Sequence, residues 1–230
     1  MTPLRLSCVR ALSAAAFVAV CAPSVASAQD VEPLRPSLSF ERVAGFNYSS
    51  VSPDEGSGGA SLSILSVGGV VVNPYASPRL GVDFPLTRGL TLGGSGSISR
   101  SSLTVDDGDT SQDVGSLTIY SLTPRIGYTF RPHTRFDLSL RAGVMLAGGS
   151  VSDNDDNGGS VFSTALDLEA VGAIRMTSSF NLLIGLAFDR TLSASASVDE
   201  SFDDGSRSET VEIKGALTTG QLWFGLGGYL

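Results

Sequence analysis

Apolar and polar residues alternate along much of this chain, which is the period-two pattern of a β-strand with one apolar face. The alternation runs through residues 76–86 and again through residues 90–98. Between them lies Thr87-Arg88-Gly89, a short segment that favours a tight turn. These two segments are therefore predicted to form a β-hairpin.

The same pattern recurs along the rest of the chain. Further strands are predicted at residues 121–130, 136–146, 166–176, 180–188, 222–230 and 38–49. In the last of these ranges Arg42 falls on the apolar face. Short turns centre on Arg88, His133 and Ser178, about 45 residues apart, but a β-propeller of that repeat length needs four strands per repeat rather than two. The pattern predicts eight strands.

The connections between hairpins differ from the turns within them. They are long, polar and acidic, and they cover residues 50–73, 101–116, 147–160 and 193–211. Short turns therefore lie at one end of the sheet and long acidic connections at the other. A soluble sandwich has no reason to separate them in this way, whereas outer-membrane barrels have short periplasmic turns and long extracellular loops.

The two faces of the strands differ in charge. On the seven clearest strands the apolar face carries no charged residue, and the opposite face carries Arg79, Asp83, Arg125, Asp137, Arg141, Asp167, Glu169, Arg175 and Asp189. A barrel lumen tolerates such charges, but a sandwich core does not. The fold class predicted is all-β, an eight-stranded antiparallel up-and-down transmembrane β-barrel. Its lumen is only just wide enough for side chains, so these charges are expected to pair and to block it.

Aromatic residues are expected at two levels of the barrel. Phe40, Phe84, Phe130, Phe136, Phe180 and Tyr229 lie beside the short turns or the termini, and Tyr48, Tyr75, Tyr120, Phe162 and Phe188 lie near the long connections. Ten residues separate Tyr120 from Phe130, which is roughly 33 Å along a strand and roughly 25 Å after tilting. That is the height of the apolar band between two aromatic girdles.

The first 28 residues have the organisation of a signal peptide. Arg5 and Arg10 form a positive region, residues 11–20 are apolar, and Ala26-Ser27-Ala28 is an A-x-A cleavage site. Cleavage after Ala28 makes Gln29 the mature N-terminus and leaves residues 29–230 as the barrel. The apolar run is too short for a membrane helix. A lipoprotein with Cys21 as the lipidated residue is disfavoured, because Val20 stands where the lipoprotein signal needs a small residue.

The composition of the chain excludes several classes of function. The chain has 230 residues, with 15 Lys+Arg against 23 Asp+Glu and a net charge of −8, which argues against binding to nucleic acid. Its cysteines, Cys8 and Cys21, both lie in the predicted signal peptide, so the mature barrel has no disulfide. No 18-residue apolar run follows the signal, and this leaves a barrel as the way to cross a membrane.

Taken together, the chain resembles the small outer-membrane β-barrel proteins of the OmpA-like class. The resemblance covers most of residues 38–230 and rests on the export signal, the alternating strands, the asymmetric connections and the last strand. In that class the last strand carries alternate apolar residues and usually a terminal aromatic, whereas here Tyr229 is penultimate and Leu230 is last. The resemblance implies a place in the outer membrane, contact with its lipids, and insertion by the barrel-assembly machinery. The chain stops at its last strand, so the class's peptidoglycan-binding domain is not expected.

Catalysis is not expected. Enzymes among the small barrels use His with Ser or Asp, but the one histidine, His133, lies in a predicted periplasmic turn, away from substrate. Asp167 and Glu169 are interpreted first as lumen charges paired with arginine. We therefore expect neither a catalytic site nor a cofactor.

A weak metal candidate lies in one acidic connection. Asp153, Asp155 and Asn157 match the start of a calcium-binding loop, but the twelfth position is Thr164 instead of the bidentate glutamate. A solvated acidic loop is the simpler interpretation.

The sequence thus favours a non-enzymatic outer-membrane barrel with a structural role, or with a surface-interaction role for its acidic loops towards an unknown partner. Two alternatives stay open: a barrel that binds or transports a small ligand, and a soluble secreted or periplasmic β-barrel.

Overall fold

The computed structural model describes residues 35–52, 60–67, 75–106, 111–153, 158–202, 205–212 and 216–230. They form strands β1 (Ser37–Ser52), β2 (Ala60–Val67), β3 (Arg79–Pro85), β4 (Leu90–Asp106), β5 (Ser111–His133), β6 (Phe136–Asp153), β7 (Gly158–Arg175), β8 (Phe180–Phe202), β9 (Gly205–Glu212) and β10 (Ala216–Tyr229). In the described ranges, no helix is long and apolar enough to cross a membrane. The predicted signal peptide, with Ala28 and Gln29, lies outside the described residues.

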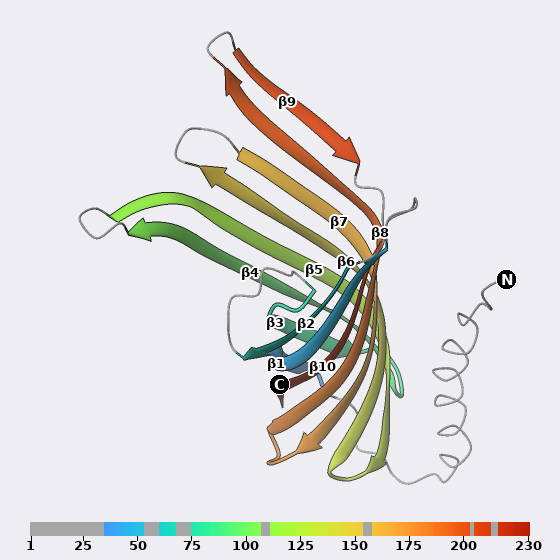
Figure 1. Cartoon of the computed structure of the whole chain (residues 1–230). Coiled ribbons are helices and arrows are strands. Elements are labelled where there is room, and N and C mark those ends of the chain that lie inside the picture. The colour runs from blue at the N-terminus through green and yellow to red at the C-terminus, as the bar shows by residue number, and fades with distance from the viewer. Residues whose placement is uncertain are drawn as a thin grey trace, which may run out of the picture. The chain divides into compact units, whose positions relative to one another are not determined.

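The strands close into a ring in which neighbours run antiparallel (Figure 1). Strand β1 pairs with β10 from Ser37 opposite Tyr229 to Ser52 opposite Ala216. Strands β2 and β3 both pair with β1, and β9 and β10 both pair with β8, so each of these two pairs fills one position in the wall. The wall therefore has eight positions. The predicted eight-stranded up-and-down barrel, closed by its first and last strands, is confirmed.

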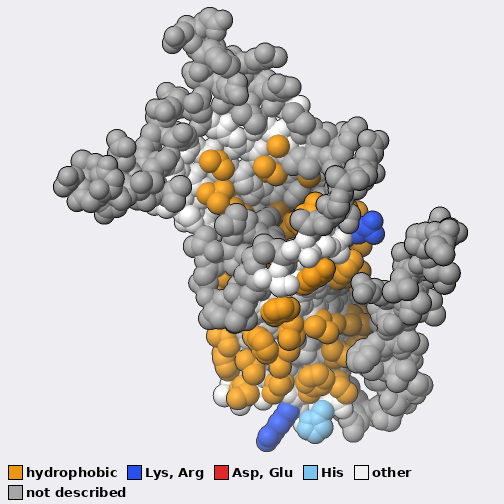
Figure 2. Space-filling view, in the orientation of Figure 1, with side chains coloured by type: hydrophobic (Ala, Val, Ile, Leu, Met, Phe, Trp, Pro, Cys, Tyr) orange, Lys and Arg blue, Asp and Glu red, His pale blue; other side chains and the backbone are white. Residues whose placement is uncertain are grey.

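Burial in the barrel is the reverse of burial in a soluble domain. Along β5, Ser121, Thr123 and Arg125 are buried, while the alternate residues Leu122 and Ile126 are exposed. Among the described residues, twenty buried ones are polar or charged and ten are hydrophobic. Figure 2 shows hydrophobic side chains covering the visible outer face of the ring. Exposed apolar surface on this scale marks an interaction site, and around a whole barrel it fits a lipid environment.

The long acidic connections are mostly strand rather than loop, which the hydrophobic pattern did not predict. Hairpins β4–β5, β6–β7 and β8–β9 continue past the ring at the end away from the short turns (Figure 1). Cross-strand hydroxyl pairs join neighbouring strands there, such as Ser116 with Ser152 at 3.1 Å and Ser160 with Ser197 at 2.7 Å. Small and polar residues dominate the sequence of these extensions, so the strands form with only a weak apolar alternation.

The short turns lie where the sequence predicts them. Between β3 and β4, the Leu86 amide donates to the Leu90 carbonyl at 2.9 Å, and Gly89 has a φ of 86°, a left-handed conformation that favours glycine. Between β7 and β8, the Met176 amide donates to the Phe180 carbonyl at 2.9 Å. These turns place the ends of six wall strands at one rim of the barrel.

Strand β1 contains a bulge that changes which way two side chains point. The pairing register shifts between Phe40 and Ala44, and Arg42 has a φ of 57°. The irregularity breaks the alternation, so Glu41 and Arg42 are both buried. The expectation that Arg42 lies on the apolar face was therefore wrong.

Candidate functional site: the charged interior of the barrel

Arg125 projects from β5 into the lumen and makes contacts there with two acidic residues. Its guanidinium meets Glu41 of β1 at 2.8 Å, from Nη1 to Oε2 and from Nη2 to Oε1. It also meets Asp83 of β3, at 3.0 Å from Nε to Oδ1 and 2.8 Å from Nη2 to Oδ2. The planar guanidinium therefore makes two hydrogen bonds to each of the two carboxylates, and such bidentate pairing is the strongest geometry for these groups.

A second arginine completes this group. Arg141 of β6 reaches the same two acids, with Nη1 2.9 Å from Glu41 Oε1 and Nη2 2.9 Å from Asp83 Oδ2. Gly93 on the neighbouring strand makes room for Asp83, because a Cβ there would lie only 2.3 Å from Asp83 Oδ1. The glycine-rich run of β4 thus relieves crowding at a buried carboxylate. We call Glu41, Asp83, Arg125 and Arg141 the central quartet.

A second group of charges adjoins the quartet. Arg42 lies 2.8 Å from Glu169, 3.2 Å from Asp189 and 3.5 Å from Asp167. Arg79 lies 3.0 Å from Asp167. Arg125 connects the two groups, with its Nη1 3.5 Å from Glu169 Oε2. The wall strands β1, β3, β5, β6, β7 and β8 are thereby joined through their side chains across the lumen.

The balance of charge in these two groups is close to neutral. Four guanidinium groups face five carboxylates, and every one of these side chains is at least nine-tenths buried. Charges removed from water in this way are stable only when their partners stay in place. The buried charges are therefore stable only while the wall strands hold them together, and their ion pairs in turn hold the wall strands in place.

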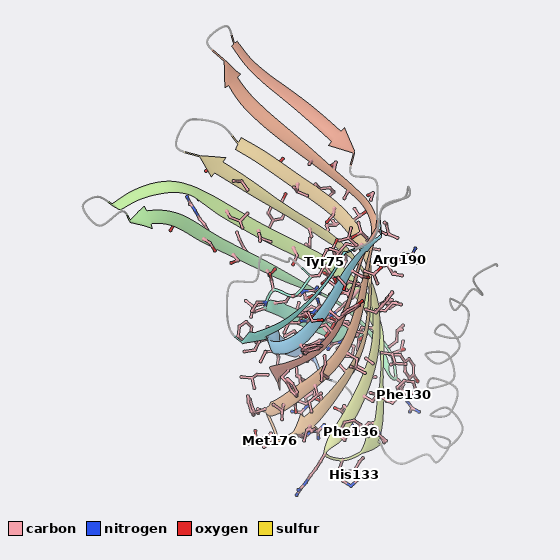
Figure 3. All side chains as sticks on the ribbon, viewed as in Figure 1. Tyr75, Phe130, His133, Phe136, Met176 and Arg190 are labelled. Carbon is pink, nitrogen blue, oxygen red and sulfur yellow. The ribbon has the colours of Figure 1, made fainter. Side chains whose placement is uncertain are left out.

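Residues Tyr75–Ser77 leave the wall between β2 and β3 and are buried inside the barrel. The Tyr75 carbonyl accepts hydrogen bonds from Arg42 and, at 3.4 Å, from Arg79. Its hydroxyl lies 2.9 Å from the hydroxyl of Thr191 and 3.2 Å from that of Ser163. Figure 3 shows Tyr75 at the level where the long hairpins leave the ring. We call this segment the Tyr75 insertion.

The Tyr75 insertion corrects two predictions. Tyr75 was expected in a lipid-facing girdle, and the strand was expected to begin at Ala76, but β3 begins at Arg79. The Tyr75 ring packs in a buried cluster with Met145, Ala147 and Ala165. The one sequence signal for this position is that Tyr75 is out of phase with the alternating residues that follow it.

An apolar cluster fills another part of the lumen. Trp223 of β10 is 0% exposed and packs with Val171, Leu183 and Ala187. A Cβ at Gly185 would lie 2.1 Å from the indole Cε2, so only glycine fits opposite the ring. The sequence analysis did not single out Trp223, although its phase is opposite to that of its apolar neighbours.

The short-turn end of the lumen has its own group of charges around Asp137. Arg131 lies 2.8 Å from this carboxylate and Arg175 lies 3.7 Å from it. The Tyr229 hydroxyl also donates to Asp137, and the Arg175 guanidinium stands 5.4 Å from the centre of the Tyr229 ring. Tyr229 therefore points towards the lumen, and its predicted place in a lipid-facing girdle was wrong. We call Arg131, Asp137, Arg175 and Tyr229 the end cluster.

A small cavity separates the end cluster from the central quartet. Its volume is about 50 Å³, and its lining includes Asp137, Arg141, Ser139 and Asn181. A buried water needs roughly 10–15 Å³, so the space suits a few water molecules rather than a larger solute. The Asn181 Oδ1 atom, which is buried there, has no protein partner among the described residues.

The structure places all nine predicted lumen charges inside the barrel, in the groups described above. Sequence reasoning missed Glu41 and Arg42, which the bulge turns inward, and Arg131, which lies in a predicted turn. His133 is exposed at the short-turn end, where its Nδ1 accepts a hydrogen bond from the Arg135 amide at 3.2 Å (Figure 3).

The calcium candidate is not described by the structure. Asp155 and Asn157 lie outside the described residues, and Asp153 ends β6 without a described side chain. In the part of the chain that is described, no three acidic, histidine or cysteine side chains gather as metal ligands.

The eight-stranded ring, the apolar outer face and the paired charges inside define the class of small outer-membrane β-barrels. The predicted class is therefore confirmed. No family model and no curated protein matches the chain.

Several solved structures are similar to this chain at low sequence identity. Neisserial surface protein A is 14% identical, with 85% of this chain and 97% of that chain covered and a TM-score of 0.48. The outer membrane protein AlkL in lipid bilayers is 12% identical, with 89% and 94% covered and a TM-score of 0.47. The outer membrane protease OmpT from Escherichia coli is 8% identical, with 90% and 100% covered and a TM-score of 0.43.

Proposed function

We propose that this chain is a non-enzymatic integral protein of a bacterial outer membrane. In this proposal the barrel is a closed anchor, and the three extended hairpins form a surface that contacts another molecule. The observation that carries the proposal is the filled lumen, in which the central quartet and its neighbouring charges connect six of the wall strands. The anchor role follows from the apolar outer face.

The closed lumen is supported at three heights. The end cluster occupies the short-turn end, the two charged groups occupy the middle, and the Tyr75 insertion lies beyond them towards the hairpins. A solute path along the axis would have to separate several buried ion pairs, and each separation leaves charges without partners. A stable open pore is therefore not expected.

The hairpins support the surface role. Strands β4 to β9 stay paired past the ring, so the backbone there is hydrogen-bonded sheet instead of loose loop. Binding to a pre-ordered surface loses less conformational entropy. The sequence there is rich in Asp, Ser and Thr, and this composition favours a partner with basic or hydrogen-bonding groups.

The absence of catalysis is part of the proposal. His133 is exposed at the short-turn end. Each acid of the charged lumen groups contacts at least one arginine, which suits a structural role better than acid–base chemistry.

The experiment that tests the closed anchor is planar-bilayer recording of the refolded mature protein. We expect no large, stable, ohmic conductance. Such a conductance would contradict the closed lumen and favour the alternative of a transport barrel. Gel mobility before and after boiling comes first, because a folded transmembrane barrel resists SDS and shifts on heating. No shift, with recovery in the soluble fraction, would favour a soluble secreted or periplasmic barrel.

Topology and processing are tested on cells. Protease added to intact cells should cut within the hairpins β4–β5, β6–β7 and β8–β9 and spare the turns at Arg88, His133 and Ser178. The reverse pattern would invert the proposed orientation. The intact mass of the exported protein should match cleavage after Ala28, and a lipid-modified start at Cys21 would replace that proposal.

A further inference from the structure

Basic side chains gather at the short-turn rim of the barrel. Arg88 lies in the β3–β4 turn, His133 and Arg135 lie at the β5–β6 turn, and all three are exposed. Arg131 and Arg175 of the end cluster lie beside them. We call Arg88, Arg131, His133, Arg135 and Arg175 the basic rim.

Backbone hydrogen bonds show that the members of the basic rim are neighbours. The Thr129 amide donates to the Gly89 carbonyl at 2.7 Å, which joins the β3–β4 turn to β5 shortly before Arg131. The Arg175 amide donates to the Arg135 carbonyl at 2.9 Å, which joins the second turn to the end of β7. The basic rim is therefore one continuous surface feature.

Arg88 and Arg135 carry the charge of the basic rim that no acid of the described structure neutralises. Within the described part of the chain, neither Arg88 nor Arg135 forms an ion pair. The acid that the described structure places within the group is Asp137, which is buried and bound to Arg131 and Arg175. Counted over the described side chains of the two turns and the end cluster, this end of the barrel is thus basic, although the chain as a whole has a net charge of −8.

The basic rim borders the apolar outer face directly. Leu86 and Met176, next to the two hairpin turns, are exposed hydrophobic residues. Tyr128 and Phe130 form a tilted aromatic pair with ring centres 4.7 Å apart, just before Arg131 in the chain. Figure 2 shows basic and histidine side chains at the lower edge of the hydrophobic face, and Figure 3 labels His133 there. Aromatic residues at this level are typical of the boundary between hydrocarbon and headgroups.

We propose that the basic rim binds the phosphate headgroups of anionic glycerophospholipids in the leaflet that the short turns meet. This inference rests on the proposed function, since it needs a barrel inserted in a membrane. An arginine fork fits two phosphate oxygens, and its long side chain reaches from the apolar boundary to the headgroup. The exposed guanidinium groups of Arg88 and Arg135 at that depth are complementary to an anionic surface.

The experiment compares lipid association of the inserted protein. The mature protein is reconstituted in phosphatidylcholine vesicles that contain a trace of spin-labelled phosphatidylglycerol or phosphatidylcholine, and the fraction of immobilised label is measured. Because each basic group near an anionic surface contributes roughly a fivefold preference, we expect wild-type protein to retain phosphatidylglycerol several-fold better. High salt should weaken this preference because it screens exposed charges.

Variants assign the preference to the basic rim. Arg88→Gln with Arg135→Gln should bring association of the two lipids close to equal, and the charge-retaining Arg88→Lys with Arg135→Lys should keep most of the difference. The matched control is Arg100→Gln with Arg190→Gln, which removes two exposed arginines away from the short turns and should leave the preference unchanged. The lysine variant keeps the test informative even where the glutamine variant inserts poorly.

The remaining outcomes distinguish a failure of the proposed function from a failure of the basic-rim proposal. Failure of wild-type protein to insert, seen as no mobility shift on boiling, would count against the proposed function itself. Equal association of both lipids with inserted wild-type protein would overturn only the basic-rim proposal. An equal loss in the Arg100/Arg190 control would also overturn it, because the preference would then arise elsewhere. Full competition by inorganic phosphate at matched ionic strength would assign the rim to a soluble anion instead.

Discussion

The central quartet and the end cluster use the same chemistry at different depths in one lumen. Arg125 meets Glu41 at 2.8 Å, and Arg131 meets Asp137 at the same distance. The first pair has side chains 2% and 0% exposed, whereas Arg175 of the end cluster is 22% exposed. Between these limits, Arg141 and Asp83 of the quartet are 10% and 6% exposed, as are Arg131 and Asp137 of the end cluster. Contact distance therefore does not distinguish the two groups, but access to water separates Arg125 and Glu41 from Arg175.

The difference in access to water determines how much each ion pair contributes to the free energy of unfolding. A charge that loses its partner near water is rehydrated, so exposed ion pairs contribute little to stability. A charge that loses its partner in a dry interior stays there at a high free-energy cost. We therefore expect substitutions of equal chemistry to have very unequal effects at the two levels.

The largest effect is expected from Arg125→Ala. It leaves Glu41 and Asp83 with Arg141 as their shared partner, and the free energy of unfolding should fall by about 3–5 kcal/mol. The measurement is urea unfolding in lipid vesicles, followed by the fluorescence of Trp223, the single tryptophan, which is buried in the lumen. Arg190→Ala, an exposed site, is the control and should change stability by less than about 0.5 kcal/mol.

A smaller loss of stability is expected from Tyr75→Phe. This substitution tests the effect of burial in the absence of a charge. Tyr75 is buried like the central quartet, but its hydroxyl bonds to Thr191 and Ser163 are between neutral groups. Their loss should lower the free energy of unfolding by about 0.5–1.5 kcal/mol. The same urea measurement applies. A loss as large as that of Arg125→Ala would show that burial alone, without charge, sets the energy.

The smallest effect is expected from Arg131→Ala in the end cluster. Asp137 keeps Tyr229 and Arg175 as partners, and Arg175 is the more exposed arginine of the cluster, so the loss should be about 0.2–1 kcal/mol. High salt should reduce this loss and leave the Arg125→Ala loss nearly unchanged, because screening acts on accessible charges. Equal losses for Arg125→Ala and Arg131→Ala would remove the distinction between the two levels and indicate a hydrated centre.

The sequence by itself determined the wall of the barrel. A strand has a side-chain period of two, so the alternation seen from Leu122 to Phe130 assigns each residue to the lipid-facing or the lumen-facing side before any partner strand is known. The same rule placed all nine predicted charges in the lumen. Turn composition, such as Gly89 with its positive φ, located the short hairpins.

Only the tertiary structure decided how the lumen is filled. Arg42 points inward because a bulge reverses its phase. This bulge leaves no mark on the hydrophobic pattern, because Phe40 and Ala44 on either side of it keep the same phase. The Tyr75 insertion depends on donors from Arg42 and Arg79 and on hydroxyls of β7 and β8, all distant in the chain. Which arginine meets which acid depends on closure of the ring between β1 and β10. Periodicity is a local property of a strand, whereas these contacts join residues that only the closed barrel brings together.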